Sequence, residues 1–146
     1  MKTLIVYMSY HRMNTERVAR AMAEAMGATL MKTDEATPED LAAYDLVGLG
    51  SGIYGGKHHK DLLALVERMP PAEGRRVFIF STSGGGKEEN HRTLRAALTA
   101  KGCRIVGEFA CKGEYRLFGP ISTSKGHPDE KEIAGARTFA RGLAAA

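Results

Sequence analysis

The chain has 146 residues, 43% of them hydrophobic, which is enough for one ordinary domain to form a core without metal ions or disulfide bonds. We therefore expect a single domain over residues 1–146. The net charge of +4 comes from scattered Lys and Arg residues without interleaved aromatics or a nucleic-acid motif, so no nucleic-acid partner is expected. The apolar run at residues 4–8 is too short for a signal peptide or a membrane span, which favours a cytoplasmic protein.

The expected elements alternate along the chain between strands and helices. Short, nearly continuous apolar runs predict strands, and apolar residues that recur on one stripe predict helices. Gly27 and Gly102 are expected to end helices, whereas Pro128 and Asp129 mark the start of the last one. In chain order we expect a strand at 4–8, a helix at 14–26, a strand at 29–33, a helix at 38–42, a strand at 46–50, a helix at 60–68, a strand at 77–80, a helix at 89–101, a strand at 104–110 and a helix at 129–143.

This alternation predicts an α/β fold, a three-layer sandwich with a five-stranded parallel sheet, because parallel neighbours require crossover connections. The order 2-1-3-4-5 suits five strands in a chain of this length. Residues 112–127 are expected to form the one long irregular segment. Cys103 and Cys111 have neither metal nor redox spacing, so we expect buried thiols in a reducing compartment.

The loop after the first strand has the composition of a phosphate site. In doubly wound sheets, ligands bind beyond the carboxyl ends of the strands, where the strand order reverses. Ser9, Asn14 and Thr15 would offer hydroxyl and amide donors there, beside the unpaired N–H groups at the start of the next helix. Arg12 and His11 would add charge-assisted donors to a phosphate monoester. A plain helix cap at Asn14 or Thr15 explains part of the same pattern.

Two further glycine-rich loops follow the third and fourth expected strands. Residues 50–56 read Gly-Ser-Gly-Ile-Tyr-Gly-Gly, in which Tyr54 would stack on a flat ring. Residues 81–86 read Ser-Thr-Ser-Gly-Gly-Gly and would present hydroxyls and backbone donors to a polar ring edge. Either loop alone is equally compatible with a surface turn or a flexible linker. The coincidence of all three loops at one edge of the sheet predicts a binding site.

Nearly the whole chain resembles the flavodoxin family. Residues 6–15, Val-Tyr-Met-Ser-Tyr-His-Arg-Met-Asn-Thr, are similar to that family's first strand and phosphate loop, with one extra residue and Met13 where Gly is usual. Residues 50–56 are similar to its second flavin loop, where an aromatic followed by Gly flanks the isoalloxazine. The resemblance implies an FMN site formed by Ser9, His11, Arg12, Met13, Asn14, Thr15, Ser51, Gly52, Ile53, Tyr54, Gly55, Thr82, Ser83, Gly84 and Gly85.

The resemblance also implies roles for two of these loops. In flavodoxins the peptide before the Gly that corresponds to Gly55 flips, so that its carbonyl accepts a hydrogen bond from N5–H of the reduced flavin. A residue without Cβ makes that flip inexpensive. The third loop, with Thr82, Ser83, Gly84 and Gly85, would line the pyrimidine edge of the flavin with backbone amides.

The implied function is electron transfer through FMN, with redox partner proteins and no dedicated catalytic residue. We expect a monomer or a weak homodimer. Unlike typical acidic flavodoxins, this chain is basic and has no Trp, so Tyr115 or Phe118 would supply the second aromatic face, unless they only pack. The alternative is a flavodoxin-fold FMN-dependent oxidoreductase that acts on a quinone, a protoporphyrinogen or another small substrate, with residues 112–127 forming its pocket.

Other classes fit the sequence less well. A signalling receiver needs carboxylates at strand ends where this chain has Ser9 and Ser51, and a Walker motif is absent. His58 and His59 are adjacent and would point apart on a helix, and the chain has no metal-binding histidine motif. We therefore expect no metal site, and expect solvated histidines at His58, His59, His91 and His127.

Overall fold

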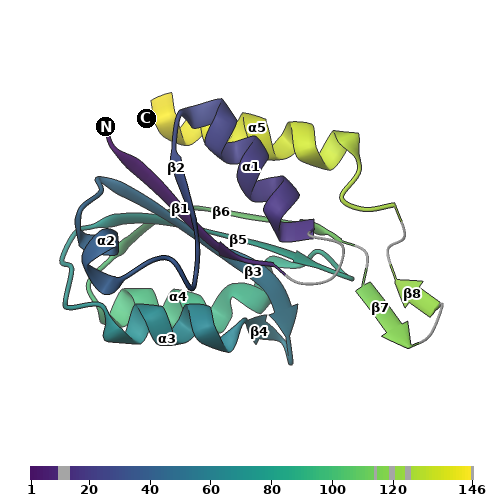
Figure 1. Cartoon of the computed structure of the whole chain (residues 1–146), viewed down its shortest axis with the longest axis horizontal. Coiled ribbons are helices and arrows are strands. Elements are labelled where there is room, and N and C mark those ends of the chain that lie inside the picture. Colours follow the sequence, from purple (N-terminus) through teal and green to yellow (C-terminus); the bar gives the residue numbers. More distant parts are fainter. Residues whose placement is uncertain (10–13, 114, 119–120, 124–125, 146) are drawn as a thin grey trace.

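The computed structural model has the expected three layers (Figure 1). Helices α1 (Asn14–Met26) and α5 (Glu130–Ala145) cover one face of a central sheet. Helices α3 (Lys60–Arg68) and α4 (Arg92–Ala100) cover the other, with the short α2 (Pro38–Ala42) beside them. The structure describes residues 1–9, 14–113, 115–118, 121–123 and 126–145, and for 115–118 and 121–123 it describes the backbone only.

The parallel strands have the predicted order. The path through the main sheet is β2-β1-β3-β5-β6, with parallel pairing at every step, which is the order 2-1-3-4-5 of the five expected strands. An added two-residue strand, β4 (Lys57–His58), pairs antiparallel with β3. The parallel strands are β1 (Thr3–Met8), β2 (Thr29–Lys32), β3 (Leu46–Tyr54), β5 (Arg76–Ser83) and β6 (Arg104–Lys112).

Two expected loops are partly strand. β3 continues to Tyr54 and turns into β4, and β5 continues to Ser83, because polar and glycine residues there still pair with neighbouring strands. The expectation of one irregular segment at residues 112–127 is wrong, since β7 (Tyr115–Phe118) and β8 (Ile121–Thr123) form an antiparallel pair there. A short 3-10 helix, η1 (Glu88–His91), precedes α4. An apolar pattern marks only the part of a strand that lies within the core.

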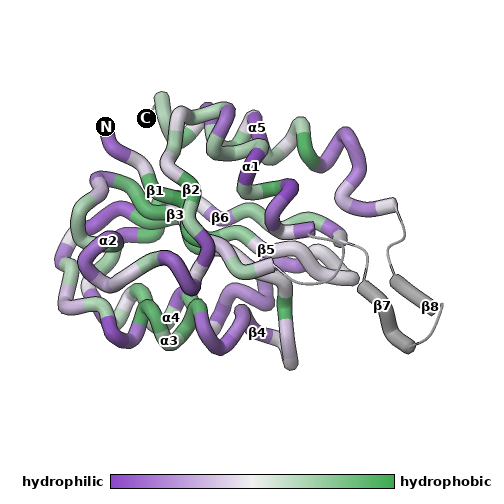
Figure 2. The backbone as a smooth tube through the Cα atoms, viewed as in Figure 1, coloured by the Kyte–Doolittle hydropathy of each residue, from purple (hydrophilic) through white to green (hydrophobic). Residues whose placement is uncertain are grey.

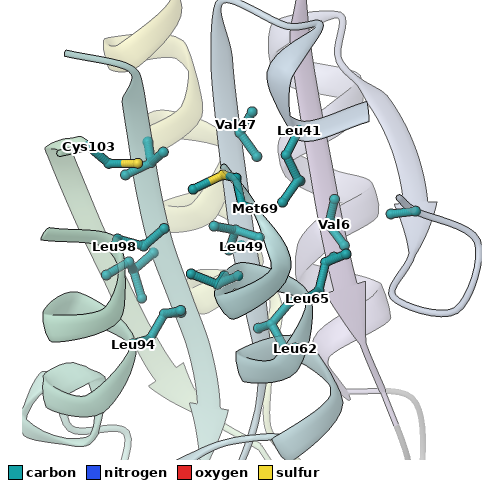
Figure 3. Close-up of a cluster of buried hydrophobic side chains, with 14 of the residues drawn as sticks. Val6, Leu41, Val47, Leu49, Leu62, Leu65, Met69, Leu94, Leu98 and Cys103 are labelled. Atoms are coloured by element: carbon teal, nitrogen blue, oxygen red, sulfur yellow. The ribbon is translucent and has the colours of Figure 1, made fainter. Parts of the chain in front are cut away.

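The core has two halves, one on each face of the sheet. Alternate residues of the strands point to opposite helical layers, so Val6 and Leu49 pack toward α3 and α4, whereas Ile5 and Phe80 pack toward α1 and α5 (Figure 3 shows the first half). Hydrophobic strands in the centre and polar helix surfaces outside are visible in Figure 2. Burial on both faces explains the near-continuous apolar runs in the sequence.

Glycines in β3 make room for two aromatic rings of β5. A Cβ atom on Gly48 would lie 2.2 Å from the ring of Phe78, and one on Gly50 would lie 2.3 Å from the ring of Phe80. Both rings are fully buried on the α1 and α5 face. Close approach between neighbouring strands therefore accounts for these two glycines.

The predicted helix ends and cysteine environments are confirmed. Gly27 directly follows α1 with a φ of 68°, and Gly102 follows Lys101, the C-cap of α4, with a φ of 85°. Cys103 and Cys111 are buried free thiols, and burial raises the pKa of Cys111 to about 12. Among the helices of the described residues, none is both long enough and apolar enough to span a bilayer.

Candidate functional site

The three loops converge as the sequence predicts. In the sheet register, Met8 at the end of β1 pairs with Ser51 of β3, and Ser51 pairs with Ser81 of β5. Thr82 is aligned with Gly52 one step further. The segments that follow β1, β3 and β5 therefore leave the same edge of the sheet side by side.

The first loop is tied to the third by a pair of hydroxyls. Thr15 Oγ1 lies 2.8 Å from Thr82 Oγ1, and both side chains are buried. Asn14 is buried too, and a Cβ on Gly113 would come within 2.9 Å of its Nδ2, so the end of β6 closes on this residue. Ser9 Oγ accepts a hydrogen bond from the Glu16 amide at 3.3 Å. The remaining predicted residues of this loop, His11, Arg12 and Met13, lie outside the described residues.

Glu16, in the first turn of α1, is held by Tyr7 of β1 and by Arg20 one helical turn further on. The Tyr7 hydroxyl donates to Glu16 Oε1 at 2.5 Å, and Arg20 lies 3.6 Å from Oε2. Burial, together with the hydrogen bond to this carboxylate, raises the pKa of Tyr7 to about 12. These contacts fix the Glu16 carboxylate beside Tyr7. A hollow of about 370 Å³ lies against this pair, lined by Tyr7, Met8, Ser9, Glu16, Lys32, Asp34 and Asp61.

The second loop is a hairpin whose base is internally bonded. Ser51 is fully buried; its Oγ donates to the Gly52 carbonyl at 2.6 Å and accepts from the His59 amide at 3.0 Å. The Ser51 hydroxyl thus holds the hairpin together. Ile53 and Tyr54 are half-buried, and the Tyr54 ring meets the His59 ring at right angles, with centroids 5.2 Å apart.

The third loop changes from buried to exposed within three residues. Ser83 is buried, and its hydroxyl accepts from the Gly86 amide at 2.7 Å, while its carbonyl accepts from the Gly113 amide at 2.9 Å. Gly84 is half-buried and Gly85 exposed. Ser83 therefore shapes the turn, and Gly84 and Gly85 bring backbone to the surface of the edge.

The expectation of solvated histidines is wrong for three of the four. His58, His59 and His91 are 1%, 6% and 0% exposed. His58 lies in β4 and His59 caps α3, so the two do not share a helix. The fourth, His127, is half-buried.

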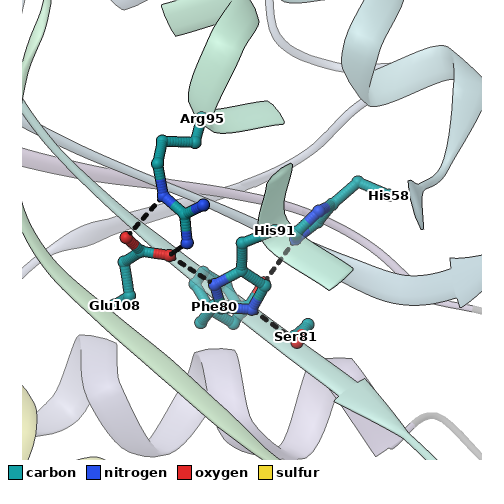
Figure 4. Close-up of polar contacts among 6 residues, drawn as sticks. All are labelled: His58, Phe80, Ser81, His91, Arg95 and Glu108. Carbon is teal, nitrogen blue, oxygen red and sulfur yellow. Dashed lines mark hydrogen bonds and ion pairs between the residues drawn. The ribbon is translucent and has the colours of Figure 1, made fainter. Parts of the chain in front are cut away.

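His58 and His91 belong to a polar network under the end of β5 (Figure 4). We use the term histidine network for these two residues together with Ser81, Arg95, Glu108 and the Phe80 carbonyl. His91 Nε2 lies 2.7 Å from Ser81 Oγ, and its Nδ1 lies 2.8 Å from Glu108 Oε1. Arg95 donates to both oxygens of Glu108, at 2.9 and 2.6 Å. On the other side, His58 Nε2 lies 2.9 Å from the Phe80 carbonyl oxygen.

The partners settle the protonation of both rings. Burial by itself would raise the pKa of Glu108, but hydrogen bonds from Arg95 and His91 together lower it, so this carboxylate is ionised and can only accept. His91 therefore donates from Nδ1 and accepts the Ser81 hydroxyl at Nε2. Burial lowers the pKa of His91 and lowers that of His58 to about 4, so both rings are neutral near pH 7.

One signal in the sequence points to this network. His91 shares helical spacing with the buried Leu94 and Leu98, and Glu108 interrupts an apolar strand. Buried polar side chains are nearly always hydrogen-bonded. A histidine on the apolar stripe of one helix and a carboxylate within an apolar strand therefore indicate that the two bond each other in the core. His91 and Glu108 are brought together because β6 lies beside β5 in the sheet.

A second cluster of titratable groups lies at the start of α5. His127, Asp129 and Glu132 each place one potential metal ligand within 4.8 Å of the others. Local capping accounts for this cluster, because Asp129 accepts from the Glu132 amide at 2.9 Å and Glu132 accepts from the Asp129 amide at 3.0 Å, while Glu132 also contacts His127. The predicted helix start at Asp129 is thereby explained.

Comparison with known proteins identifies related sequences. Residues 4–117 match the model of the flavodoxin domain family. An uncharacterized protein of Methanocaldococcus jannaschii is 40% identical over 150 aligned residues, covering 98% of both chains.

Solved structures share the fold at lower identity. A flavodoxin from Streptococcus pneumoniae TIGR4 superposes with a TM-score of 0.75 at 17% identity, covering 99% of both chains. Flavodoxin 2 from Bacillus cereus gives 0.71 at 23% identity, covering 99% of this chain and 97% of that one. A WrbA-like flavodoxin from Agrobacterium tumefaciens gives 0.70 at 20% identity, covering 99% of this chain and 95% of that one.

Proposed function

Because the chain belongs to the flavodoxin family, we propose that it binds FMN and uses it to exchange electrons with partner proteins. The observation that supports this most directly is the junction of the first and third loops through Thr15 and Thr82, 2.8 Å apart at the carboxyl edge of the sheet. A single ligand with an anionic end and a flat polar ring would contact all three loops there.

The start of α1 suits the phosphate of such a ligand. Its first-turn amides point out of the helix, and the helix dipole favours an anion at this end. Asn14 and Thr15 bring an amide and a hydroxyl to the same place. The negative charge of Glu16 is compensated by Arg20 and directed toward Tyr7, so it opposes phosphate binding less than a free carboxylate would.

The second and third loops suit the ring. Tyr54 offers an aromatic surface held edge-on by His59, and Gly84 and Gly85 bring peptide groups near the surface without side chains. Bound FMN would supply the redox chemistry, and the residues of the chain would orient it and exclude water from it. Gly55, with a φ of 60°, gives the turn beside Tyr54 its tight geometry.

One observation favours the alternative, a substrate-specific FMN-dependent oxidoreductase. The hollow of about 370 Å³ beside Tyr7, Ser9 and Glu16 adjoins the first loop and is large enough for a small molecule. Turnover of a quinone or a protoporphyrinogen by the FMN-loaded protein would establish this activity. A carrier would exchange electrons with redox proteins and leave these small substrates unchanged.

Visible spectroscopy and calorimetry test FMN binding directly. We expect a yellow protein that releases FMN on denaturation and an apoprotein that binds added FMN with measurable heat. Tyr54→Ala should raise the FMN dissociation constant about tenfold, because it removes the stacking surface. The matched control is Tyr44→Ala, a half-buried tyrosine near Lys2 at the opposite edge, which should leave FMN affinity unchanged. A folded apoprotein that gives no heat with FMN would refute the proposal.

A further inference from the structure

The turn between β3 and β4 consists of two exposed glycines, Gly55 and Gly56. Gly55 and Gly56 have φ values of 60° and 80°, and no described atom lies within 4 Å of the position that a Cβ would occupy on either. The strand that follows, β4, is only two residues long. Because these glycines have no side chains, the position of the turn is set by other residues of the hairpin, including those at its base.

His58 is one of the residues that hold the base of the hairpin, beside Ser51, whose hydroxyl bonds Gly52 and His59. The ring of His58 is 1% exposed, and Nε2 lies 2.9 Å from the carbonyl oxygen of Phe80. A carbonyl oxygen can only accept, so Nε2 carries the proton and Nδ1 is the bare acceptor. Within the described residues Nδ1 has no hydrogen-bond partner. The buried ring thus makes one directional bond, and that bond joins the hairpin to the end of β5.

The same end of β5 is held from its next residue as well. Ser81, which follows Phe80, bonds His91 at 2.7 Å, and the two histidine ring centroids are 5.2 Å apart. His91 in turn bonds Glu108, and Arg95 donates to that carboxylate (Figure 4). Because Arg95 is on α4 and Glu108 on β6, the network connects the hairpin to two elements that lie far from it in the sequence. The second and third loops are thus joined at their bases through Phe80 and Ser81.

We propose that His58, supported by His91, is a positioning residue that fixes the Tyr54–Gly55 turn relative to the third loop and so sets the gap between the two loops. The part that concerns FMN rests on the proposed function, since these are the loops proposed to flank the ring. His58 is buried beneath the turn and acts through the backbone, without touching the ligand.

Amide hydrogen exchange of the apoprotein tests the anchoring without FMN. His58→Phe keeps a ring of similar shape but has no donor, and exchange at residues 53–58 should accelerate about tenfold relative to β1. His58→Gln places an N–H donor at similar reach and should restore exchange to within about threefold of wild type. Ser81→Ala, a smaller change, should accelerate the same amides about threefold by releasing His91.

FMN affinity provides the second measurement. If FMN binds, His58→Phe should weaken it about fivefold and His58→Gln should largely restore it. Folded His58→Phe and Ser81→Ala proteins whose hairpin amides exchange at the wild-type rate would overturn the anchoring. If the hairpin amides of His58→Phe exchange faster but FMN affinity is unchanged, His58 does not set the gap between the loops that would flank FMN. A wild-type protein that does not bind FMN refutes the proposed function instead, and the exchange result still decides the anchoring.

Discussion

Ser81 and Thr82 are consecutive residues of β5, yet their side chains meet opposite helical layers and different kinds of partner. Ser81 joins an ionisable network of His91, Glu108 and Arg95 on the α4 side. Thr82 Oγ1 lies 2.8 Å from another hydroxyl, that of Thr15 on the α1 side. Both residues are fully buried at the same strand end.

The end of β5 therefore has a neutral hydroxyl pair on one face and a charged network on the other, and the two should respond to different changes. A neutral hydroxyl pair tolerates rearrangement, since either atom donates, and it leaves the α1 side suited to an anionic ligand. A buried network with charges is stable only while every group keeps its partner. Sensitivity to acid should therefore concentrate on the α4 side, and sensitivity to ligand on the α1 side.

Acid should have the largest effect. The pKa of His58 is about 4 in the folded protein against 6.5 in the unfolded chain, so between these values the unfolded state binds the extra proton. The contribution of His58 to stability should be fully present above pH 6.5 and fall by about 3 kcal/mol as pH drops from 6.5 to 4. His91, whose ring and carboxylate partner Glu108 face His58, has its own pKa lowered by burial and adds to the loss. Urea unfolding at a series of pH values measures it.

The control for this prediction removes the titrating ring and keeps the donor. His58→Gln should flatten the pH dependence between 6.5 and 4, leaving the part due to His91. His127→Gln removes a half-buried histidine outside the network and should leave the slope as it is. If the unfolding free energy of the wild-type protein is constant over this pH range, His58 takes up a proton as readily in the folded protein as in the unfolded chain, which contradicts the prediction.

Loss of charge at Glu108 should have an intermediate effect. Glu108→Gln keeps an acceptor for His91 but replaces the charge-assisted bonds from Arg95 by weaker ones, which should cost about 1–2 kcal/mol in urea unfolding at pH 7. Glu24→Gln, at an exposed position on α1, should change stability by less than about 0.5 kcal/mol. Equal effects of the two substitutions would mean that the network contributes no more than a surface charge.

The fold could be predicted because its signals are local. Runs such as residues 77–80 and the helical stripe of residues 14–26 reflect burial on both faces of a strand and on one face of a helix. Predicted bounds failed where pairing continues without apolar residues, as in Gly52 and Thr82, or where two short strands pair in residues 115–123. Backbone pairing leaves little trace in side-chain hydropathy.

The convergence of the three loops was predicted from the sequence, whereas the contacts that hold the second and third loops were not. Ser9, Thr15 and Thr82 meet at one edge because the parallel order forces strand ends together. Ser51 was expected to face a ligand, yet its hydroxyl bonds Gly52 and His59, since a hydroxyl beside a hairpin finds nearer partners. The histidine network joins residues up to 50 positions apart in the sequence, from His58 to Glu108, and no local pattern reports such pairing.

The smallest effect on stability should come from the hydroxyl pair. Thr15→Val removes one hydrogen bond at nearly constant shape and should cost about 1 kcal/mol in urea unfolding. Thr33→Val, which removes a buried hydroxyl bond to the Tyr7 carbonyl at 3.0 Å, should cost a similar amount and is the matched control. Only Thr15→Val should also weaken FMN binding in calorimetry, by about tenfold, because a hydroxyl donor to the phosphate would be lost. If both variants bind FMN alike, the phosphate does not contact Thr15. The α1 side of β5 would then not be the side that responds to the ligand.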